Sequence, residues 1–182
     1  MYGLVNKAIK GLIESQFGPE TWREIALRAK LPQCPFLSMR SYPDQLTYEL
    51  VSATSEVLKL SAAEVLEVFG EHWILFTAKE GYGGLLEHCG QDLREFLLNI
   101  DMLHTRVGLI FPELQPPGFK TFEQPDGSIR LEYYSSRAGL TPMVSGLLKG
   151  LAKRFGTSAQ IEQIAADNSS QYQAAFNIRW QR

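Results

Sequence analysis

The chain has 182 residues and a formal net charge of −2, with 45% hydrophobic and 21% charged residues. This length suits one domain with a sizeable core, and we expect a single domain over residues 1–182. No lysine- or arginine-rich run marks a nucleic-acid surface, no apolar run spans a membrane, and the N-terminus lacks a signal-peptide layout, so we expect a cytoplasmic protein.

Apolar residues at helical spacing predict a first helix over about residues 5–17, which Gly18 ends. Pro19 then opens a second helix, through about residue 29, because proline suits the first helical position. Residues 31–43 contain three prolines and are expected to be irregular.

The pattern over residues 46–57 suits another helix, and Ser61-x-x-Glu64 is a capping box ahead of the next one. Glycines at 81, 83 and 84 then mark a break. After it we expect one long helix that ends near residues 111–112. Its apolar stripe contains a histidine, and consists of Leu93, Phe96, Leu97, Ile100, His104 and Val107.

The last third of the chain changes to a strand pattern. Residues 119–122 and 129–135 are expected to form a hairpin through Gln124-Pro125-Asp126-Gly127. A helix over about residues 142–155 and two more strands follow, and the alternation over residues 172–180 predicts one buried sheet face. Helices followed by hairpins predict an α+β fold with an antiparallel sheet.

The segment Tyr133-x-Ser135-x-Arg137 is a candidate carboxylate clamp. Residues two apart on a strand share a face, so one guanidinium and two hydroxyls are expected to point the same way. With His104 on an apolar helix face, this combination suits a haem, with the imidazole for iron and the clamp for propionates. The alternatives are a hydrogen-bonded core histidine and an ion pair between Arg137 and an acidic side chain of the chain.

Several segments spread along the chain resemble the H-NOX (haem nitric oxide/oxygen binding) domain, which also forms the amino end of the soluble guanylate cyclase beta subunit. The matching segments are Met1-Tyr2-Gly3-Leu4-Val5-Asn6, Gly18-Pro19-Glu20-Thr21-Trp22, Leu103-His104, Pro116-Pro117-Gly118-Phe119 and Tyr133-Tyr134-Ser135-Ser136-Arg137. The resemblance implies a helical N-terminal lobe and a C-terminal lobe with a four-stranded antiparallel sheet that encloses the haem.

The resemblance also implies a role for each residue. His104 is the proximal iron ligand, and Tyr133, Ser135 and Arg137 hold the propionates. Pro117 packs against the haem, although Pro116-Pro117 is also a stiff connection. The distal pocket consists of Val5, Trp73, Met143 and Leu147.

Oxygen-binding members carry a tyrosine donor where this chain has Met143, which has none. We therefore expect a sensor that binds nitric oxide and carbon monoxide and excludes oxygen. The Trp73 indole and Tyr2 remain possible donors.

The expected function is a stand-alone gas sensor, not an enzyme, that signals to another chain. By resemblance the partner is a histidine kinase or a diguanylate cyclase. The alternatives are a haem enzyme such as a peroxidase and a haem-free interaction domain. The chain has no Cys-x-x-Cys-His, so non-covalent haem b is expected.

The remaining histidines and the cysteines have simpler interpretations. Cys34 and Cys89 are expected to be small hydrophobic residues. His88-Cys89 is expected to be a helix end and not a zinc site, because no second ligand pair lies nearby. His72 is expected to point away from any pocket that Trp73 faces, since neighbours on a helix diverge by about 100°.

Overall fold

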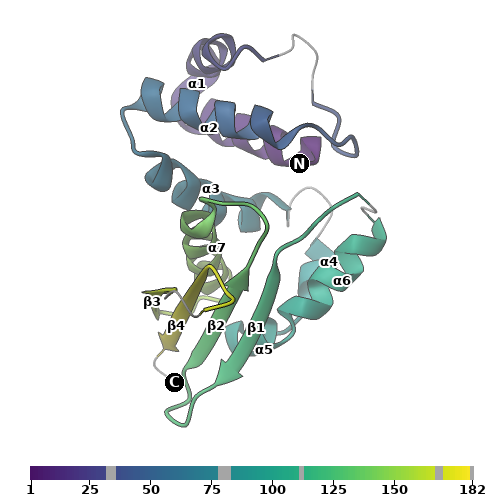
Figure 1. The fold of residues 1–182 in the computed structure, drawn as a ribbon, viewed down its shortest axis with the longest axis vertical. Helices are drawn as coiled ribbons and strands as arrows, with labels where there is room; N and C mark the ends of the chain where they lie inside the picture. Colours follow the sequence, from purple (N-terminus) through teal and green to yellow (C-terminus); the bar gives the residue numbers. More distant parts are fainter. Residues whose placement is uncertain (32–35, 78–82, 111–112, 167–169, 181–182) are drawn as a thin grey trace.

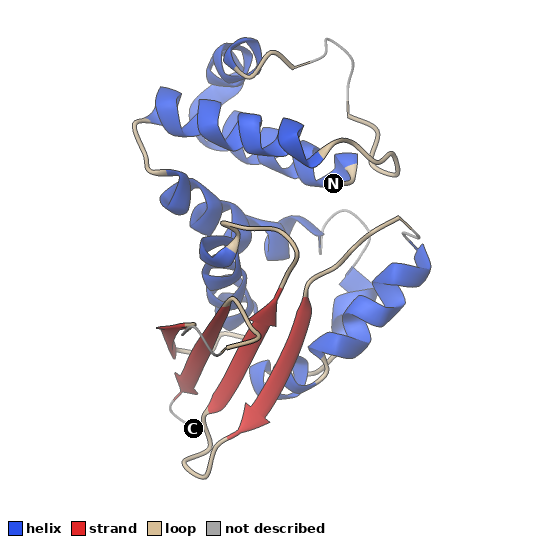
Figure 2. Cartoon of the chain, in the orientation of Figure 1, coloured by secondary structure: helices blue, strands red, loops and turns tan. Residues whose placement is uncertain are grey.

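The computed structural model describes residues 1–31, 36–77, 83–110, 113–166 and 170–180. Helices at the N-terminal end form a helical lobe, and the sheet with its covering helices forms a second lobe (Figure 1). Figure 2 distinguishes the helices from the sheet by colour. The predicted α+β class with a four-stranded antiparallel sheet is confirmed.

The helical lobe consists of α1 (Gly3–Arg28) and α2 (Asp44–Leu58), and α3 (Ala62–Thr77) leads from it into the second lobe. Gly18 interrupts α1 with a left-handed φ of 85°, a conformation that favours glycine. The prediction of two helices that meet at Gly18 and Pro19 is therefore confirmed, although they form one kinked element. The capping box is also confirmed, since the Glu64 N–H donates to Ser61 Oγ over 3.2 Å and the Ser61 N–H donates to Glu64 Oε2 over 2.8 Å.

The predicted long helix before the sheet is wrong in its continuity. The structure has α4 (Gly83–Glu87), α5 (Leu93–Leu98) and α6 (Ile100–Ile110), and its expected end at residues 111–112 lies outside the described residues. The break falls at Asn99, whose Nδ2 donates to the carbonyl of Cys89 over 3.0 Å. This bond reaches ten residues back along the chain, so the apolar spacing of the helix does not reveal it.

The sheet contains β1 (Gly118–Glu123), β2 (Ile129–Tyr134), β3 (Ala159–Ala165) and β4 (Ala174–Trp180) in the order β1-β2-β4-β3, with every pair antiparallel. The hairpin between β1 and β2 turns as predicted, with Gly127 at a φ of 80°. Helix α7 (Thr141–Arg154) lies between β2 and β3 in the chain and packs tightly against α3.

The main core lies between one face of the sheet and the helices of the second lobe. Leu131 and Phe176 face each other on paired strands and are fully buried, together with Phe96 of α5 and Leu151 of α7. Burying one such side chain contributes about 1.5–3 kcal/mol. This core fixes the sheet against the helices that lead to His104.

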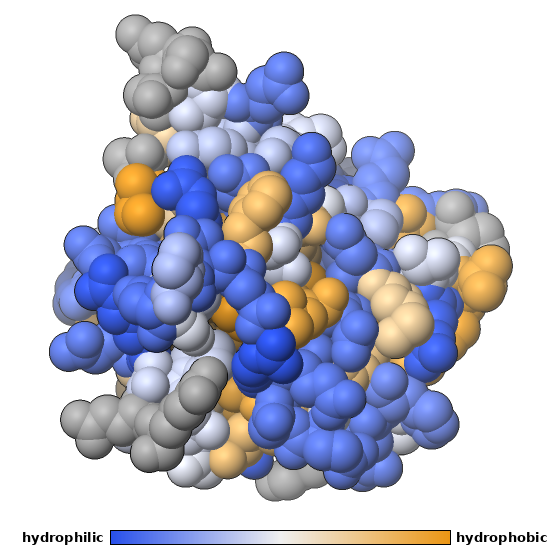
Figure 3. Space-filling model, turned by 90° about the horizontal axis from the view of Figure 1, so that it is seen from below, coloured by the Kyte–Doolittle hydropathy of each residue, from blue (hydrophilic) through white to orange (hydrophobic). Residues whose placement is uncertain are grey.

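The outer surface is mainly hydrophilic on the side opposite the helical lobe. Figure 3 shows apolar side chains there only in small separate groups. Within the described ranges, every helix is too short or too polar to cross a bilayer.

Candidate functional site

One apolar cavity lies where the two lobes meet. Its volume is about 280 Å³, and its lining includes residues of α1, α3, α4, α6 and α7, of β1 and the segment before it, and of the end of β2 with the loop that follows. The structure brings every site residue expected from the sequence to this cavity, and these residues are Val5, Trp73, His104, Pro117, Tyr133, Ser135, Arg137, Met143 and Leu147.

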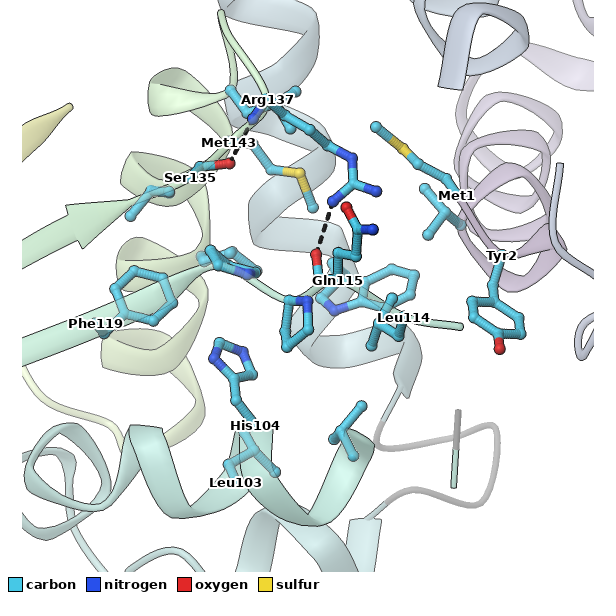
Figure 4. Close-up of a pocket in the computed structure, with 18 of the residues that line it drawn as sticks. Met1, Tyr2, Leu103, His104, Leu114, Gln115, Phe119, Ser135, Arg137 and Met143 are labelled. Atoms are coloured by element: carbon cyan, nitrogen blue, oxygen red, sulfur yellow. Dashed lines mark hydrogen bonds between the residues drawn. The ribbon is translucent and has the colours of Figure 1, made fainter. Parts of the chain in front are cut away.

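His104 reaches the cavity from α6. Its ring stacks on Phe119 of β1, with ring centroids 5.4 Å apart and planes 29° apart. Figure 4 shows the imidazole directed from its helix toward the other cavity residues. This position agrees with the predicted apolar stripe, since Ile100, which lies one turn earlier on that stripe, is buried.

Burial favours the neutral form of the His104 imidazole. Burial lowers its pKa, and this effect outweighs the Asp101 carboxylate and the Pro117 carbonyl, which both raise it. Nδ1 is buried and has no hydrogen-bond partner within the described part of the chain. A neutral imidazole is the form that binds a metal.

Tyr133 and Ser135 form the polar side of the cavity. Tyr133 is 2% exposed, at the inward-facing end of β2. Burial raises the pKa of its hydroxyl, whereas a hydrogen bond with Ser135 lowers it. Ser135 Oγ also accepts a hydrogen bond from the Arg137 N–H over 3.0 Å, so this hydroxyl orders the loop as well as the cavity wall.

Tyr133, Ser135 and Arg137 do not share one strand face. The sequence predicts a strand through Ser135, with Tyr133, Ser135 and Arg137 on one face, but β2 ends at Tyr134. Ser135 and Arg137 lie in the following loop and reach the same cavity through the turn that their own hydrogen bond stabilises. The prediction of a shared location is right, and the strand argument for Arg137 is wrong.

Arg137 contacts both lobes. Its Nε donates to Asp44 Oδ2 over 2.7 Å, and its Nη1 donates to the Gln115 carbonyl over 2.7 Å. Figure 4 shows the second bond. The alternative that Arg137 pairs with an acidic side chain is therefore observed. Guanidinium carries five N–H donors, and these two bonds use two of them, so the pairing does not exhaust its capacity for a carboxylate ligand.

Asp44 is strongly anchored in this arrangement. It also accepts a hydrogen bond from the Met1 ammonium over 2.6 Å. Partial burial would raise the pKa of Asp44, but Arg137 and the Met1 ammonium lower it further than burial raises it. The carboxylate is ionised at neutral pH and shares its charge between two cations.

The wall opposite His104 is apolar. Val5 comes from α1, Trp73 from α3, and Met143 and Leu147 from α7. Helices α3 and α7 can approach closely because Gly70 and Gly146 have no Cβ at their contact. A Cβ on Gly146 would overlap the Glu67 carbonyl oxygen, and one on Gly70 would overlap the Met143 carbonyl oxygen. The glycines therefore allow Trp73 and Met143 to share one wall.

The two alternative donors differ in their placement. The Tyr2 hydroxyl accepts a hydrogen bond from the Glu113 N–H over 3.1 Å, and Figure 4 shows it pointing away from Met143 and His104. Trp73 lines the cavity, with its ring 5.9 Å from Phe69 and 6.3 Å from Phe76. His72 is absent from the described lining and its ring lies 5.8 Å from Phe76, in agreement with its expected direction.

The described lining of the cavity does not include His88 or Cys89. Helix α4 ends at Glu87, so His88 and Cys89 lie in a turn as predicted, and Cys89 is buried. Among the described residues no three histidine, cysteine or acidic side chains form a metal-binding group. Cys34 lies outside the described residues.

Several cavity residues were missed by the sequence interpretation. They include Gln115 and Phe119 near the polar groups, and Leu86, Leu114 and Val144 in the apolar wall. Asp44, which bonds Arg137 but does not line the cavity, was also missed. Phe119 belongs to a matching segment and to a predicted strand, so its inward direction was accessible from alternation. Asp44 gave no such signal, because it lies 93 positions before Arg137.

The comparisons with known proteins agree with this geometry. Residues 2–163 match the family model described as Haem-NO-binding. The chain therefore belongs to the H-NOX family, whose members are haem-based gas-sensing domains.

Known relatives carry the domain as part of longer chains. Soluble guanylate cyclase gcy-32 of Caenorhabditis elegans is 32% identical over 157 residues, which cover 85% of this chain and 23% of the relative. Guanylate cyclase soluble subunit beta-2 of Rattus norvegicus is 38% identical over 91 residues, which cover 50% of this chain and 13% of the relative. The chain spans about a quarter or less of the length of these relatives.

Solved structures share the whole fold. An H-NOX protein from Shewanella oneidensis in the Fe(II)NO state superposes with a TM-score of 0.89 at 21% identity, over all of both chains. The Fe(II) unliganded H-NOX protein from K. algicida superposes with a TM-score of 0.85 at 25% identity, over all of this chain and 97% of that one.

Proposed function

We propose that this chain is a sensor that binds nitric oxide and carbon monoxide at a ferrous haem ligated by His104, and that excludes oxygen. The observation that carries the proposal is the convergence of nine residues from six parts of the chain on one apolar cavity. We also propose that residues 1–182 act as a single domain, because both lobes contribute walls to that cavity.

The residues fit a haem in three respects. His104 offers a neutral imidazole with a buried Nδ1 that lacks a partner within the described ranges. Arg137 and Ser135 supply charged and neutral donors at the polar side, where carboxylates are expected. The rest of the lining is mostly aliphatic or aromatic, as a flat apolar macrocycle requires. A haem held by His104 and the polar residues would supply a ferrous iron that can bind a diatomic gas.

We infer the gas selectivity from Met143 and its neighbours. Val5, Met143 and Leu147 carry no hydrogen-bond donor in their side chains. Bound oxygen gains more from a donor than nitric oxide or carbon monoxide does, because it accumulates negative charge. This wall therefore favours the two gases that need no donor. The Trp73 indole is the remaining donor of the proposed distal set.

A haem enzyme such as a peroxidase is the second candidate, and the distal wall argues against it. That chemistry needs an acid–base group beside the iron. Val5, Met143 and Leu147 cannot transfer a proton, and His72, the nearest histidine in sequence to Trp73, is absent from the described lining.

The output of the sensor is proposed to pass to a separate protein. By resemblance to the family, a histidine kinase or a diguanylate cyclase is the proposed partner. Guanylate cyclases carry the matching domain within longer chains, which agrees with a role in signalling. The cytoplasmic location stays a prediction of the sequence.

An absorption experiment tests the proposed function. The protein is purified, loaded with haem, reduced, and scanned under argon, air, nitric oxide and carbon monoxide. We expect a Soret band that shifts with nitric oxide and carbon monoxide and is the same under air as under argon at early times. Absence of a Soret band would leave the haem-free interaction domain, and steady peroxidase turnover would favour the enzyme.

A further inference from the structure

A short connector links the helix of His104 to the sheet. It starts at Glu113, ends at Pro117, and runs from the end of α6 toward β1. Two of its hydrogen bonds within the described residues join it to other parts of the fold. The Glu113 N–H donates to the Tyr2 hydroxyl over 3.1 Å, and the Gln115 carbonyl accepts from Arg137 over 2.7 Å. The helical lobe and the loop after β2 therefore hold the connector at different points.

Tyr2 is fixed within the helical lobe. It is 7% exposed and lies directly before α1. Its backbone forms a β-bridge with Ser41, and the flanking Gly3 N–H donates to the Arg40 carbonyl over 2.8 Å. The position of the Tyr2 hydroxyl is thus set by the start of α1 and by the segment that precedes α2.

The same residue lies against the helix of His104. Tyr2 and Leu4 form a small apolar cluster on which Val107 and Leu114 pack. Val107 lies three positions after His104, which places the two side chains one helical turn apart on neighbouring parts of α6. A shift of α6 must therefore move the surface on which this cluster rests, together with the connector that Tyr2 bonds.

We propose that Tyr2 is a positioning residue that links the helix of His104 to the helical lobe. Its ring packs in the apolar cluster that contains Val107 of α6, so a movement of α6 displaces the ring. Its hydroxyl accepts the hydrogen bond from Glu113 and so connects the connector to the start of α1. A change in the position of His104 on gas binding is thereby passed to α1 and α2. The inference rests on the proposed function, because gas binding is the event that moves His104.

Hydrogen–deuterium exchange of the haem-loaded full chain tests this link. Exchange is measured with and without nitric oxide, and is normalised to the gas-bound fraction read from the absorption spectrum. Tyr2→Phe removes only the hydroxyl. Tyr48→Phe is the matched control, because the Tyr48 hydroxyl also joins the lobes, donating to the Ala138 carbonyl over 3.2 Å.

We expect nitric oxide to change exchange in α1 and α2 of the unmodified protein and of Tyr48→Phe. In Tyr2→Phe we expect the effect of nitric oxide on the amide-opening equilibrium of α1 and α2 to be about fivefold smaller. A hydrogen bond of about 1 kcal/mol corresponds to roughly that factor. The Glu113 amide should also exchange faster in Tyr2→Phe without gas, because its acceptor is gone.

Three results would overturn the inference while the proposed function stands. In the first, Tyr2→Phe keeps the full nitric-oxide-dependent change in exchange of α1 and α2. In the second, Tyr2→Phe and Tyr48→Phe lose that change equally. In the third, the unmodified protein binds nitric oxide without any change in exchange of α1 and α2. Failure of the proposed function looks different, because the unmodified protein would then show no haem spectrum that responds to nitric oxide.

Discussion

Arg137 and Asp44 join the two lobes at the edge of the cavity, with 2.7 Å between Arg137 Nε and Asp44 Oδ2. The pair connects the loop after β2 with the first turn of α2. Their side chains are 19% and 36% exposed, so solvent screens the pair only in part. The contact gives the cavity a rigid polar corner.

The first prediction concerns acid sensitivity. Because the pKa of Asp44 is lowered in the folded protein, its ionised form stabilises the fold above the unfolded-state pKa, near 3.8, and this contribution is lost as the pH falls through the lower folded-state value. Asp44→Asn should reduce the free energy of unfolding at pH 7 by about 0.5–1.5 kcal/mol. The deficit should shrink in urea titrations repeated toward pH 3.

Glu56→Gln is the control for this experiment. Glu56 forms an exposed pair with Arg28 at 3.5 Å, and such pairs contribute little to stability. If Asp44→Asn and Glu56→Gln behave alike at both pH values, the Arg137–Asp44 pair does not stabilise the fold.

A second prediction concerns the contact between α3 and α7. Gly146→Ala should lower the free energy of unfolding by about 1–3 kcal/mol, because the new Cβ overlaps the Glu67 carbonyl and forces the helices apart. Gly108→Ala, in α6, meets no atom within 4 Å and should raise stability by up to about 1 kcal/mol through helix propensity. Equal stability of the two variants in urea would contradict the close helix contact.

The sequence predicted the parts of this fold that depend on local patterns. Gly18, the Ser61–Glu64 capping box and the turn at Gly127 each act through their own backbone, so their positions follow from residue type. The break at Asn99 was missed because it depends on a bond to Cys89, ten residues earlier. The spacing of apolar residues in helices and strands indicates which side chains are buried, but it does not indicate which polar groups bond one another.

The sequence predicted some residues of the candidate site but not the partner of Arg137. His104 and Tyr133 follow from apolar periodicity together with the family resemblance. Arg137 was expected at the right place for a partly wrong reason, since β2 ends before it. Asp44 was not expected, because a partner 93 positions away is fixed by how the lobes pack and not by any local pattern.

The third prediction concerns haem retention. Arg137→Ala should release haem faster than Tyr133→Phe, because charged hydrogen bonds are about twice as strong as neutral ones and Arg137 supplies charge as well. Transfer of haem to an excess of apomyoglobin measures both dissociation rates. Equal rates in the two variants would argue against propionate binding at Arg137.

A fourth prediction concerns oxygen. A hydrogen bond to a charged group contributes about 1.5–3 kcal/mol, which corresponds to a roughly ten- to hundredfold change in affinity. Met143→Tyr introduces a donor in the apolar wall and should raise oxygen affinity by that factor, as measured by absorption spectra of the ferrous protein under graded oxygen. A stable oxygen complex in the unmodified protein would overturn the selectivity account and point to Trp73.

His104→Gly tests the central claim most directly. The ferrous spectra of the unmodified protein, His104→Gly and the control His88→Gly are recorded before and after addition of free imidazole. Because His88 lies in an exposed turn, its variant should match the unmodified protein. The account predicts that only His104→Gly loses the unmodified spectrum and that imidazole restores it, and a ferrous spectrum of His104→Gly identical to the unmodified one would contradict it.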